Sequence, residues 1–251
     1  MKEMIEELSI PSDPNLAPGE ARCPGRSVND ILSSENSRHD DGLMASSYKF
    51  LGSEDLPFSR YTDQEFYDQE IKKVWSKVWQ WACREEHVKE PGDYYVYDIG
   101  PYSAIVIRDA ANKIRAYVNS CPHRGMAFFD PGSQGTGKQF LRCPFHGMSW
   151  NLDGSLREIP CRWDFPHVSD ESFGLTEIPS GTWAGFVFIN FDLECGPLGD
   201  YLEVLPDHFK EWGLENRRVA IHTYKELPGN WKMCMEGFLE AFHVLATHPE
   251  G

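Results

Sequence analysis

The spacing of apolar and polar residues changes several times along the chain. Residues 1–56 carry clusters of Pro, Ser, Asn, Asp and Gly without helical or strand periodicity, which predicts a flexible N-terminal extension. Thr62 and Glu65 then match a capping box, and apolar residues follow at near-helical spacing. This pattern predicts an amphipathic helix that starts near Thr62 and ends near Ala82, with its Trp side chains in the core.

From Gly92 onward the apolar residues recur with a period of two, which is typical of half-buried strands. The short apolar runs that we expect to form strands cover residues 94–99, 103–107, 114–118, 139–142 and 185–191. Gly, Pro, Asn and Asp separate these runs. We therefore expect a small antiparallel β domain over residues 57–195, which includes the preceding helix.

Helical spacing returns after residue 196. Helices are expected around residues 201–212 and from Asn230 to His243, with a strand over residues 217–225 between them. These elements predict the beginning of a second, mixed domain over residues 196–251. The expected fold class is α+β: an antiparallel β domain followed by the start of a mixed α/β domain.

Composition and charge exclude several classes of protein. Among 251 residues, 24 Lys and Arg against 39 Asp and Glu give a net charge of −15, which repels nucleic acid and anionic membranes. The apolar runs are far shorter than the ~18 residues that cross a bilayer, and the first residues lack the pattern of a secretory signal. We expect a soluble cytoplasmic protein in which the seven cysteines bind metal or are buried rather than form disulfides.

Two loops each offer one thiolate and one imidazole. The first loop, CPHRG, contains Cys121 and His123, and the second, CPFHG, contains Cys143 and His146. Proline after each cysteine restricts the backbone, and glycine near each histidine lets the backbone approach a bulky inorganic centre. One Cys and one His on each of two facing loops suit a [2Fe–2S] cluster, in which both thiolates bind one iron and both imidazoles the other. A structural zinc site with the same four ligands, and a site without metal, are the alternatives.

A second polar group lies near the end of the last expected helix. Glu236, Glu240 and His243 are spaced i, i+4 and i+7, so they share one face of a continuous helix. His248 would point ~140° away from His243 on that helix, because each residue turns it by ~100°. The helix must end or bend if both histidines bind one metal, and Pro249 biases His248 out of the helical region. Two unrelated polar residues on a surface turn are the alternative.

These motifs carry a resemblance to a known family. CPHRG followed by CPFHGMSWNLDG resembles the cluster signature of Rieske non-haem iron oxygenase large (alpha) subunits, the ring-hydroxylating oxygenase family. NWKxxxExxxExxHxxxxH, from Asn230 to His248, resembles the mononuclear iron segment of the same family. The resemblance covers residues 56–250 and implies a Rieske [2Fe–2S] domain followed by the start of a catalytic domain of the helix-grip type.

The resemblance also implies roles for individual residues. The implied ligands of the Rieske cluster are Cys121, His123, Cys143 and His146. His243 and His248 are implied to bind a mononuclear Fe(II) as two members of a 2-His-1-carboxylate triad. Glu240 stands where the family more often has Asp, a residue that bridges a cluster histidine of one subunit to an iron-ligating histidine of the next. The family's third ligand comes from far downstream, so we assign none and expect a truncated subunit that is inactive alone.

The function implied by the resemblance is that of a Rieske-type oxygenase. Electrons are expected to come from NAD(P)H through a flavoprotein reductase, a ferredoxin or both, and to pass through the cluster to the Fe(II), where O2 is activated. The expected reaction is mono- or dioxygenation of a small organic substrate, foremost an aromatic one, by a homotrimer or an alpha3beta3 assembly. The alternative is a Rieske electron carrier without catalysis, which would hold two rather than three irons per chain.

Overall fold

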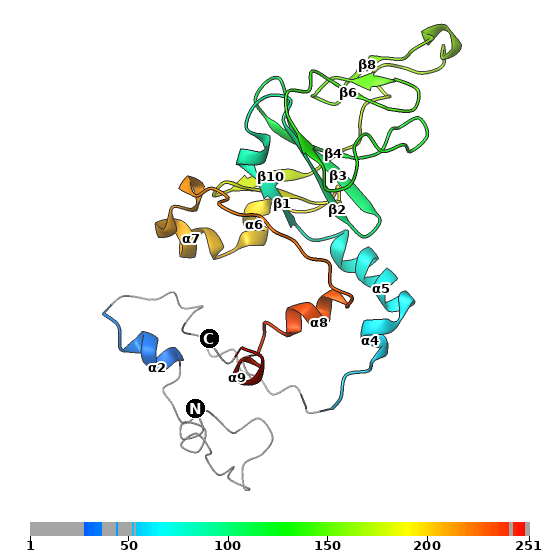
Figure 1. Ribbon diagram of the computed structural model, residues 1–251. Helices are drawn as coiled ribbons and strands as arrows, with labels where there is room; N and C mark the ends of the chain where they lie inside the picture. The colour runs from blue at the N-terminus through cyan, green and yellow to red at the C-terminus, as the bar shows by residue number, and fades with distance from the viewer. Residues whose placement is uncertain (1–27, 37–43, 45–51, 53, 241–242, 249–251) are drawn as a thin grey trace. The chain divides into compact units, whose positions relative to one another are not determined.

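The computed structural model describes residues 28–36, 44, 52, 54–240 and 243–248 (Figure 1). The chain divides into two compact units, Met1–Phe58 and Ser59–Gly251. In the first unit, α2 (Val28–Ser33) is a short helix where we predicted none, and Asp30 in its first turn favours it. The other residues of the predicted extension, apart from 34–36, 44, 52 and 54–56, lie outside the described part of the chain.

The second unit begins with three consecutive helical segments: α4 (Ser59–Thr62), α5 (Gln64–Glu70) and the π turn η1 (Ile71–Trp75). Asp63 caps α5 in place of Thr62, because its side chain accepts a hydrogen bond from the Phe66 amide at 3.1 Å. The prediction of a helix that continues to Ala82 is wrong. Residues Gln80–Arg84 form the strand β1, which pairs with a strand from the far end of the domain.

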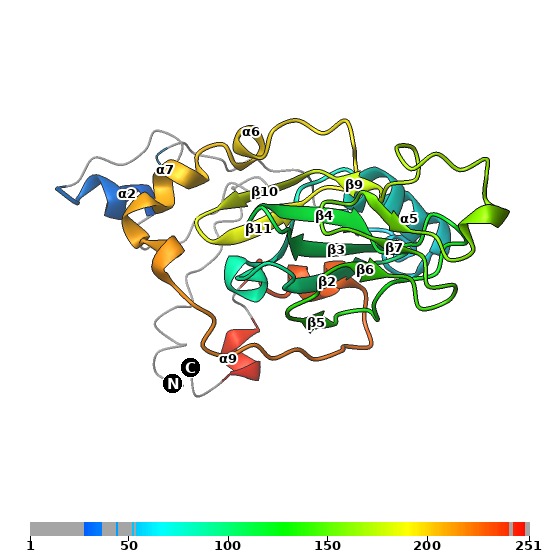
Figure 2. The ribbon, with the colours of Figure 1, turned by 90° about the horizontal axis from the view of Figure 1, so that it is seen from above.

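Among the described residues the strands form three antiparallel sheets. The largest has the order β5-β2-β3-β4-β9, and Figure 2 shows β4, β3, β2 and β5 side by side. Its strands are β2 (Tyr94–Ile99), β3 (Tyr102–Arg108), β4 (Ile114–Val118), β5 (Gln134–Gly135) and β9 (Glu177–Ile178). The predictions for residues 94–99, 103–107 and 114–118 are confirmed.

The two smaller sheets each have three strands. One has the order β1-β11-β10 and contains β10 (Ser180–Trp183) and β11 (Phe186–Ile189) beside β1. The other has the order β6-β7-β8, with β6 (Leu141–Arg142), β7 (Ser149–Trp150) and β8 (Leu156–Glu158). The predicted strands at 139–142 and 185–191 contain β6 and β11. The pattern missed β1, β5, β7, β8, β9 and β10, of which all but β1 and β10 have two or three residues.

The core has two apolar clusters on opposite faces of the largest sheet. Alternation along β3 shows the division, because Ile105 and Ile107 belong to one cluster and Val106 to the other. The first cluster also contains Leu141 and Trp150 from the β6–β7 hairpin, together with both predicted cysteine ligands. The predicted cluster loops are therefore attached to the rigid core of the domain.

Short helices follow the β domain: α6 (Leu198–Leu202), α7 (Leu205–Phe209), η4 (Lys210–Trp212), η5 (Leu214–Asn216), α8 (Trp231–Glu236) and α9 (Val244–Thr247). The helices predicted around 201–212 are confirmed. Residues 217–225, all of which the structure describes, form no strand, so that prediction is wrong. Their backbone finds no neighbouring strand in the described part of the chain, and Ile221 and Tyr224 are 82% and 88% exposed.

The prediction of one helix from Asn230 to His243 is also wrong. α8 ends at Glu236 and is followed by Gly237, whose low helix propensity favours a stop, and α9 begins at Val244. Within the described residues, no helix combines the length and the apolar character that crossing a bilayer requires.

Candidate metal centres

The first predicted cluster loop follows β4 and is fixed to the large sheet by Asn119. The side-chain oxygen of Asn119 accepts hydrogen bonds from the Phe128 and Phe129 amides at 3.0 and 3.2 Å. Its side-chain nitrogen donates to Ser103 Oγ at 3.0 Å and to the Phe129 carbonyl at 2.9 Å. Asn119 is 5% exposed, so these bonds are shielded from water and hold both ends of the loop.

The second loop forms the tip of the β6–β7 hairpin and repeats the backbone bonding of the first. The Cys121 amide donates to the Met126 carbonyl at 2.8 Å, and the Cys143 amide donates to the Met148 carbonyl at 2.8 Å. Gly125 and Gly147 each donate back to the cysteine four residues earlier, and each has φ of +76°. A side chain would strain this conformation, which explains a glycine at the same place in both loops.

The structure brings the four predicted cluster ligands together as two pairs. The thiols of Cys121 and Cys143 are almost fully buried and belong to the same apolar cluster of the core. The imidazole rings of His123 and His146 are 4.8 Å apart, measured between centroids, and are inclined by 61°. His123 Nδ1 is buried and has no hydrogen-bond partner among the described residues. A buried nitrogen without a partner is costly unless it binds something, and a metal ion is the ligand that an imidazole lone pair suits.

The electrostatics of the pairs fit a positively charged centre. Burial raises the pKa of the Cys121 thiol more than hydrogen bonds from the His123 and Arg124 amides lower it, and Cys143 raises it further. Burial lowers the pKa of His123, and His146 and Arg124 act in the same direction, so the ring is neutral at pH 7. Two adjacent thiolates become stable when a cation neutralises them, and a neutral imidazole is the form that binds metal. Among the described residues, no group of three or more His, Cys, Asp or Glu side chains is placed to hold a single metal ion. A Rieske cluster needs only two protein ligands for each of its two irons, so the two pairs are compatible with it.

The predicted iron segment brings Glu240, His243 and His248 close together. His243 Nδ1 and Glu240 Oε1 are 2.6 Å apart, and the His243 amide donates to Glu240 Oε2 at 3.2 Å. The rings of His243 and His248 are 5.6 Å apart, measured between centroids. His248 ends α9 with φ of −125°, outside the helical region, as predicted.

Glu236 does not join these residues. Because α8 ends at Glu236, the helical face that we predicted for Glu236, Glu240 and His243 does not exist. Glu236 instead accepts a hydrogen bond from the Tyr61 hydroxyl at 2.8 Å and lies 3.6 Å from Arg60. This hydrogen bond raises the pKa of Tyr61.

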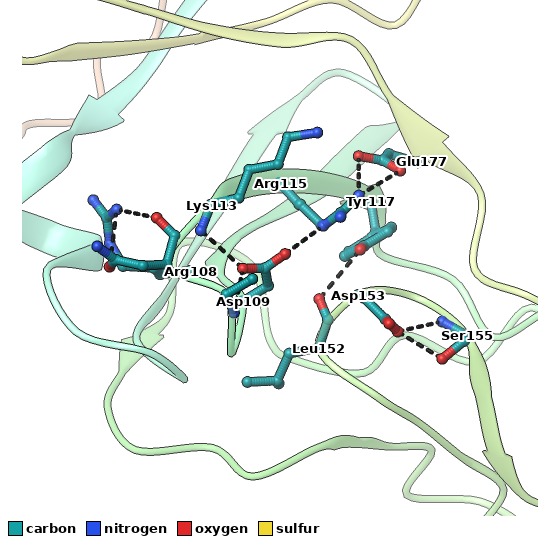
Figure 3. Close-up of polar contacts among 11 residues, drawn as sticks. Arg108, Asp109, Lys113, Arg115, Tyr117, Leu152, Asp153, Ser155 and Glu177 are labelled. Carbon is teal, nitrogen blue, oxygen red and sulfur yellow. Dashed lines mark hydrogen bonds and ion pairs between the residues drawn. The ribbon is translucent and has the colours of Figure 1, made fainter.

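Polar contacts that we did not predict connect the turn after β3, β4, β9 and the segment after β7 (Figure 3). The buried carboxylate of Asp109 accepts hydrogen bonds from the Lys113 amide at 2.8 Å and from Arg115 Nε at 2.7 Å. The buried Tyr117 of β4 donates a hydrogen bond to the Leu152 carbonyl at 3.2 Å, which connects the large sheet to the segment after β7. Asp109 follows the predicted strand 103–107, where an Asp is typical of a turn. Nothing in the sequence pattern indicated that the Tyr117 hydroxyl makes a long-range hydrogen bond.

Comparison with known proteins agrees with this geometry. Residues 78–169 match the family model of the Rieske [2Fe-2S] domain. The large oxygenase component of salicylate 5-hydroxylase from Ralstonia sp. is 29% identical over 211 residues, which are 78% of this chain and 49% of that protein. The oxygenase subunit of carnitine monooxygenase from Escherichia coli (strain K12) is 28% identical over 196 residues, covering 77% of this chain and 52% of that protein. The chain thus spans about half the length of the curated relatives it matches.

Solved structures give the same result. A quaternary ammonium Rieske monooxygenase in complex with L-carnitine superposes with a TM-score of 0.71 at 26% identity, covering 77% of this chain and 55% of that one. A naphthalene 1,2-dioxygenase bound to phenanthrene superposes with a TM-score of 0.66 at 27% identity, covering 74% of this chain and 43% of that one. These matches confirm the predicted α+β fold class with its antiparallel β Rieske domain. The chain contains a Rieske [2Fe-2S] domain and is homologous to Rieske oxygenase large subunits over about three quarters of its length.

Proposed function

We propose that Cys121, His123, Cys143 and His146 hold a Rieske [2Fe–2S] cluster. The observation that carries this proposal is that the His123 and His146 imidazoles are adjacent and come from the same two loops as the buried Cys121 and Cys143, while His123 Nδ1 is buried without a hydrogen-bond partner among the described residues. When bound, such a cluster supplies one-electron transfer. The chain's own contribution is to bury the thiols and to leave His146 exposed, so that a redox partner can approach the imidazole side.

We propose that His243 and His248 bind a mononuclear Fe(II), and that Glu240 positions His243. A carboxylate is an acceptor at pH 7, so the 2.6 Å contact places the proton of His243 on Nδ1 and directs it to Glu240. The lone pair of His243 then lies on Nε2, which is the atom left to bind metal. When bound, a mononuclear iron with open positions supplies O2 activation.

For the intact protein we propose oxygenation of a small organic substrate, with electrons from NAD(P)H through a reductase, a ferredoxin or both. The relatives are named for salicylate, carnitine, glycine betaine and choline, which include an aromatic acid and quaternary ammonium compounds. Because these substrates differ in chemistry, the aromatic substrate stays a prediction. The cytoplasmic location also stays a prediction. We also propose residues 57–195 as the Rieske domain, residues 196–251 as the start of the catalytic domain, and a trimeric or alpha3beta3 assembly.

Anaerobic reconstitution with iron and sulfide tests the cluster assignment. The wild-type chain should gain the visible absorption and the electron paramagnetic resonance of a reduced Rieske cluster, and Cys143→Ser and His146→Ala should not. Cys161→Ser is the matched control, because Cys161 is a free, exposed cysteine outside both loops. A colourless zinc-loaded wild type, or equal signals in Cys143→Ser and Cys161→Ser, would contradict the proposal.

A further inference from the structure

Four residues of the motif that contains the predicted iron ligands have no role in metal binding: Asn230, Trp231, Lys232 and Glu236. All four contact the helical segments α4, α5 and η1 at the start of the second unit. Figure 1 shows α8 beside α4 and α5, although about 160 residues separate them in sequence. The common partner indicates that this part of the motif is a docking element.

The centre of the contact is a buried ion pair between Lys232 and Glu70. Lys232 Nζ lies 2.8 Å from both carboxylate oxygens of Glu70, and the two residues are 2% and 8% exposed. The ammonium group also lies over the ring of Phe66 at 5.1 Å and over the ring of Trp231 at 5.3 Å. Cations are attracted to aromatic faces, so these rings and the carboxylate enclose the lysine on several sides. Removing one partner of such a pair leaves an uncompensated buried charge.

Both ends of α8 are held as well. At the start, Asn230 caps the helix by accepting from the Lys232 amide at 3.0 Å, and its side-chain nitrogen donates to the Tyr61 carbonyl at 3.0 Å. At the end, Glu236 accepts from the Tyr61 hydroxyl. The ring of Trp231 packs edge-on against Trp75 of the π turn, with 5.0 Å between centroids. The single residue Tyr61 therefore contacts the first and last parts of the helix.

A helix of six residues is not stable in isolation, so these contacts decide where α8 lies. The chain turns at Gly237 directly after it and reaches Glu240 within three residues. We propose that α4, α5 and η1 act as a clamp on α8 that positions the predicted iron ligands, with the Lys232–Glu70 pair at its centre. The positioning part of this inference rests on the proposed function of His243 and His248.

Hydrogen exchange in the cluster-loaded chain tests the clamp. Lys232→Met and Glu70→Gln each leave one buried charge unpaired, so amides of residues 231–237 should exchange about a hundredfold faster or more. The double variant removes both charges and should return the exchange to within about tenfold of wild type. Lys225→Met and Glu65→Gln are matched controls at exposed positions and should leave the exchange unchanged. Single variants that exchange like the controls, or a double variant no better than the single variants, would overturn the clamp.

Binding of Co(II) alone to the cluster-loaded chain tests the positioning. The single variants should weaken Co(II) binding about tenfold, with loss of the paramagnetically shifted imidazole resonances, and the double variant should restore both. Unchanged Co(II) binding in variants with accelerated exchange would overturn the positioning role. If wild type and His243→Ala bound Co(II) equally, the iron assignment and the positioning that rests on it would fail, while the exchange comparison would still decide whether the clamp exists.

Discussion

Gly154 lies against the ring of Tyr117, at the place where the segment after β7 meets the large sheet. Its φ is +86°, and a Cβ atom there would lie 2.7 Å from Tyr117 Cε1 and 3.0 Å from the hydroxyl oxygen. Tyr117 is fully buried and donates to the Leu152 carbonyl, so its ring has no free space into which it can move. Gly154→Ala should therefore destabilise the attachment of the cluster hairpin to the core.

The expected loss has two parts. A non-glycine residue in this backbone region costs about 1–2 kcal/mol. Forcing a methyl group into a packed core costs a further ~1–3 kcal/mol, which gives roughly 2–5 kcal/mol in the free energy of unfolding. Gly132→Ala is the matched control, because Gly132 has φ of +65° and nothing within 4 Å of the added atom. It should lose only the first part.

Urea unfolding of the cluster-loaded chain, followed by circular dichroism, measures both variants. Gly154→Ala should unfold at a clearly lower urea concentration than Gly132→Ala, with the same dependence on denaturant. Equal losses in the two variants would refute the reasoning, because they would show that backbone strain alone matters and that the contact with Tyr117 does not.

Three further predictions follow from the polar contacts. Burial alone would raise the pKa of Asp109, but hydrogen bonds from Arg115 and two backbone amides outweigh burial and lower this pKa. Asp109→Asn should therefore lower the free energy of unfolding at pH 7 by about 2–3 kcal/mol. In urea titrations at several pH values, the difference in free energy of unfolding between wild type and Asp109→Asn should have its full size above pH ~4 and vanish as the pH falls through the lowered pKa. A difference that does not change with pH would contradict this prediction. Arg84→Met removes hydrogen bonds to three main-chain carbonyls at 3.1, 3.1 and 2.6 Å and should lower the melting temperature by several degrees, with the exposed Arg218→Met as control. For the oxygenase activity proposed for the intact protein, Glu240→Gln should leave both metals bound but slow oxygen consumption about tenfold or more, and unchanged turnover would exclude the role of Glu240 beside His243.

The sequence pattern was sufficient to predict β2, β3, β4 and the two ligand loops. β2 alternates between buried and half-buried residues in its first half, whereas β3 and β4 have consecutive buried residues because apolar clusters cover both faces of the sheet. The paired ligand loops were visible because their chemistry requires Cys, His and Gly at fixed spacing. The structure adds that both loops share one backbone conformation, with φ of +76° at Gly125 and Gly147.

Long-range pairing decides the elements that the patterns missed. β1 continues an apolar helical pattern in sequence, but Gln80 pairs with Ile189 and Arg84 with Phe186, more than a hundred residues away. Trp79, expected in the core, is 9% exposed, whereas Trp81 on this strand is 56% exposed. The segment 217–225 shows the opposite case, because a strand pattern forms no sheet where no neighbouring strand is described. The low helix propensity of Gly237 favours an end of the helix there, but no local pattern predicts the contact between α8 and α5.

Iron and acid-labile sulfide in the anaerobically reconstituted chain, quantified together with its electron paramagnetic resonance, test the central claim most directly. We predict about two irons and two sulfides per chain in the cluster, with a rhombic signal on one-electron reduction that Cys121→Ser and His123→Ala abolish. Co(II) or Fe(II) bound in addition at His243 and His248 would leave the sulfide content unchanged. A chain that binds one zinc through the same four residues, without sulfide and without the signal, would contradict the account.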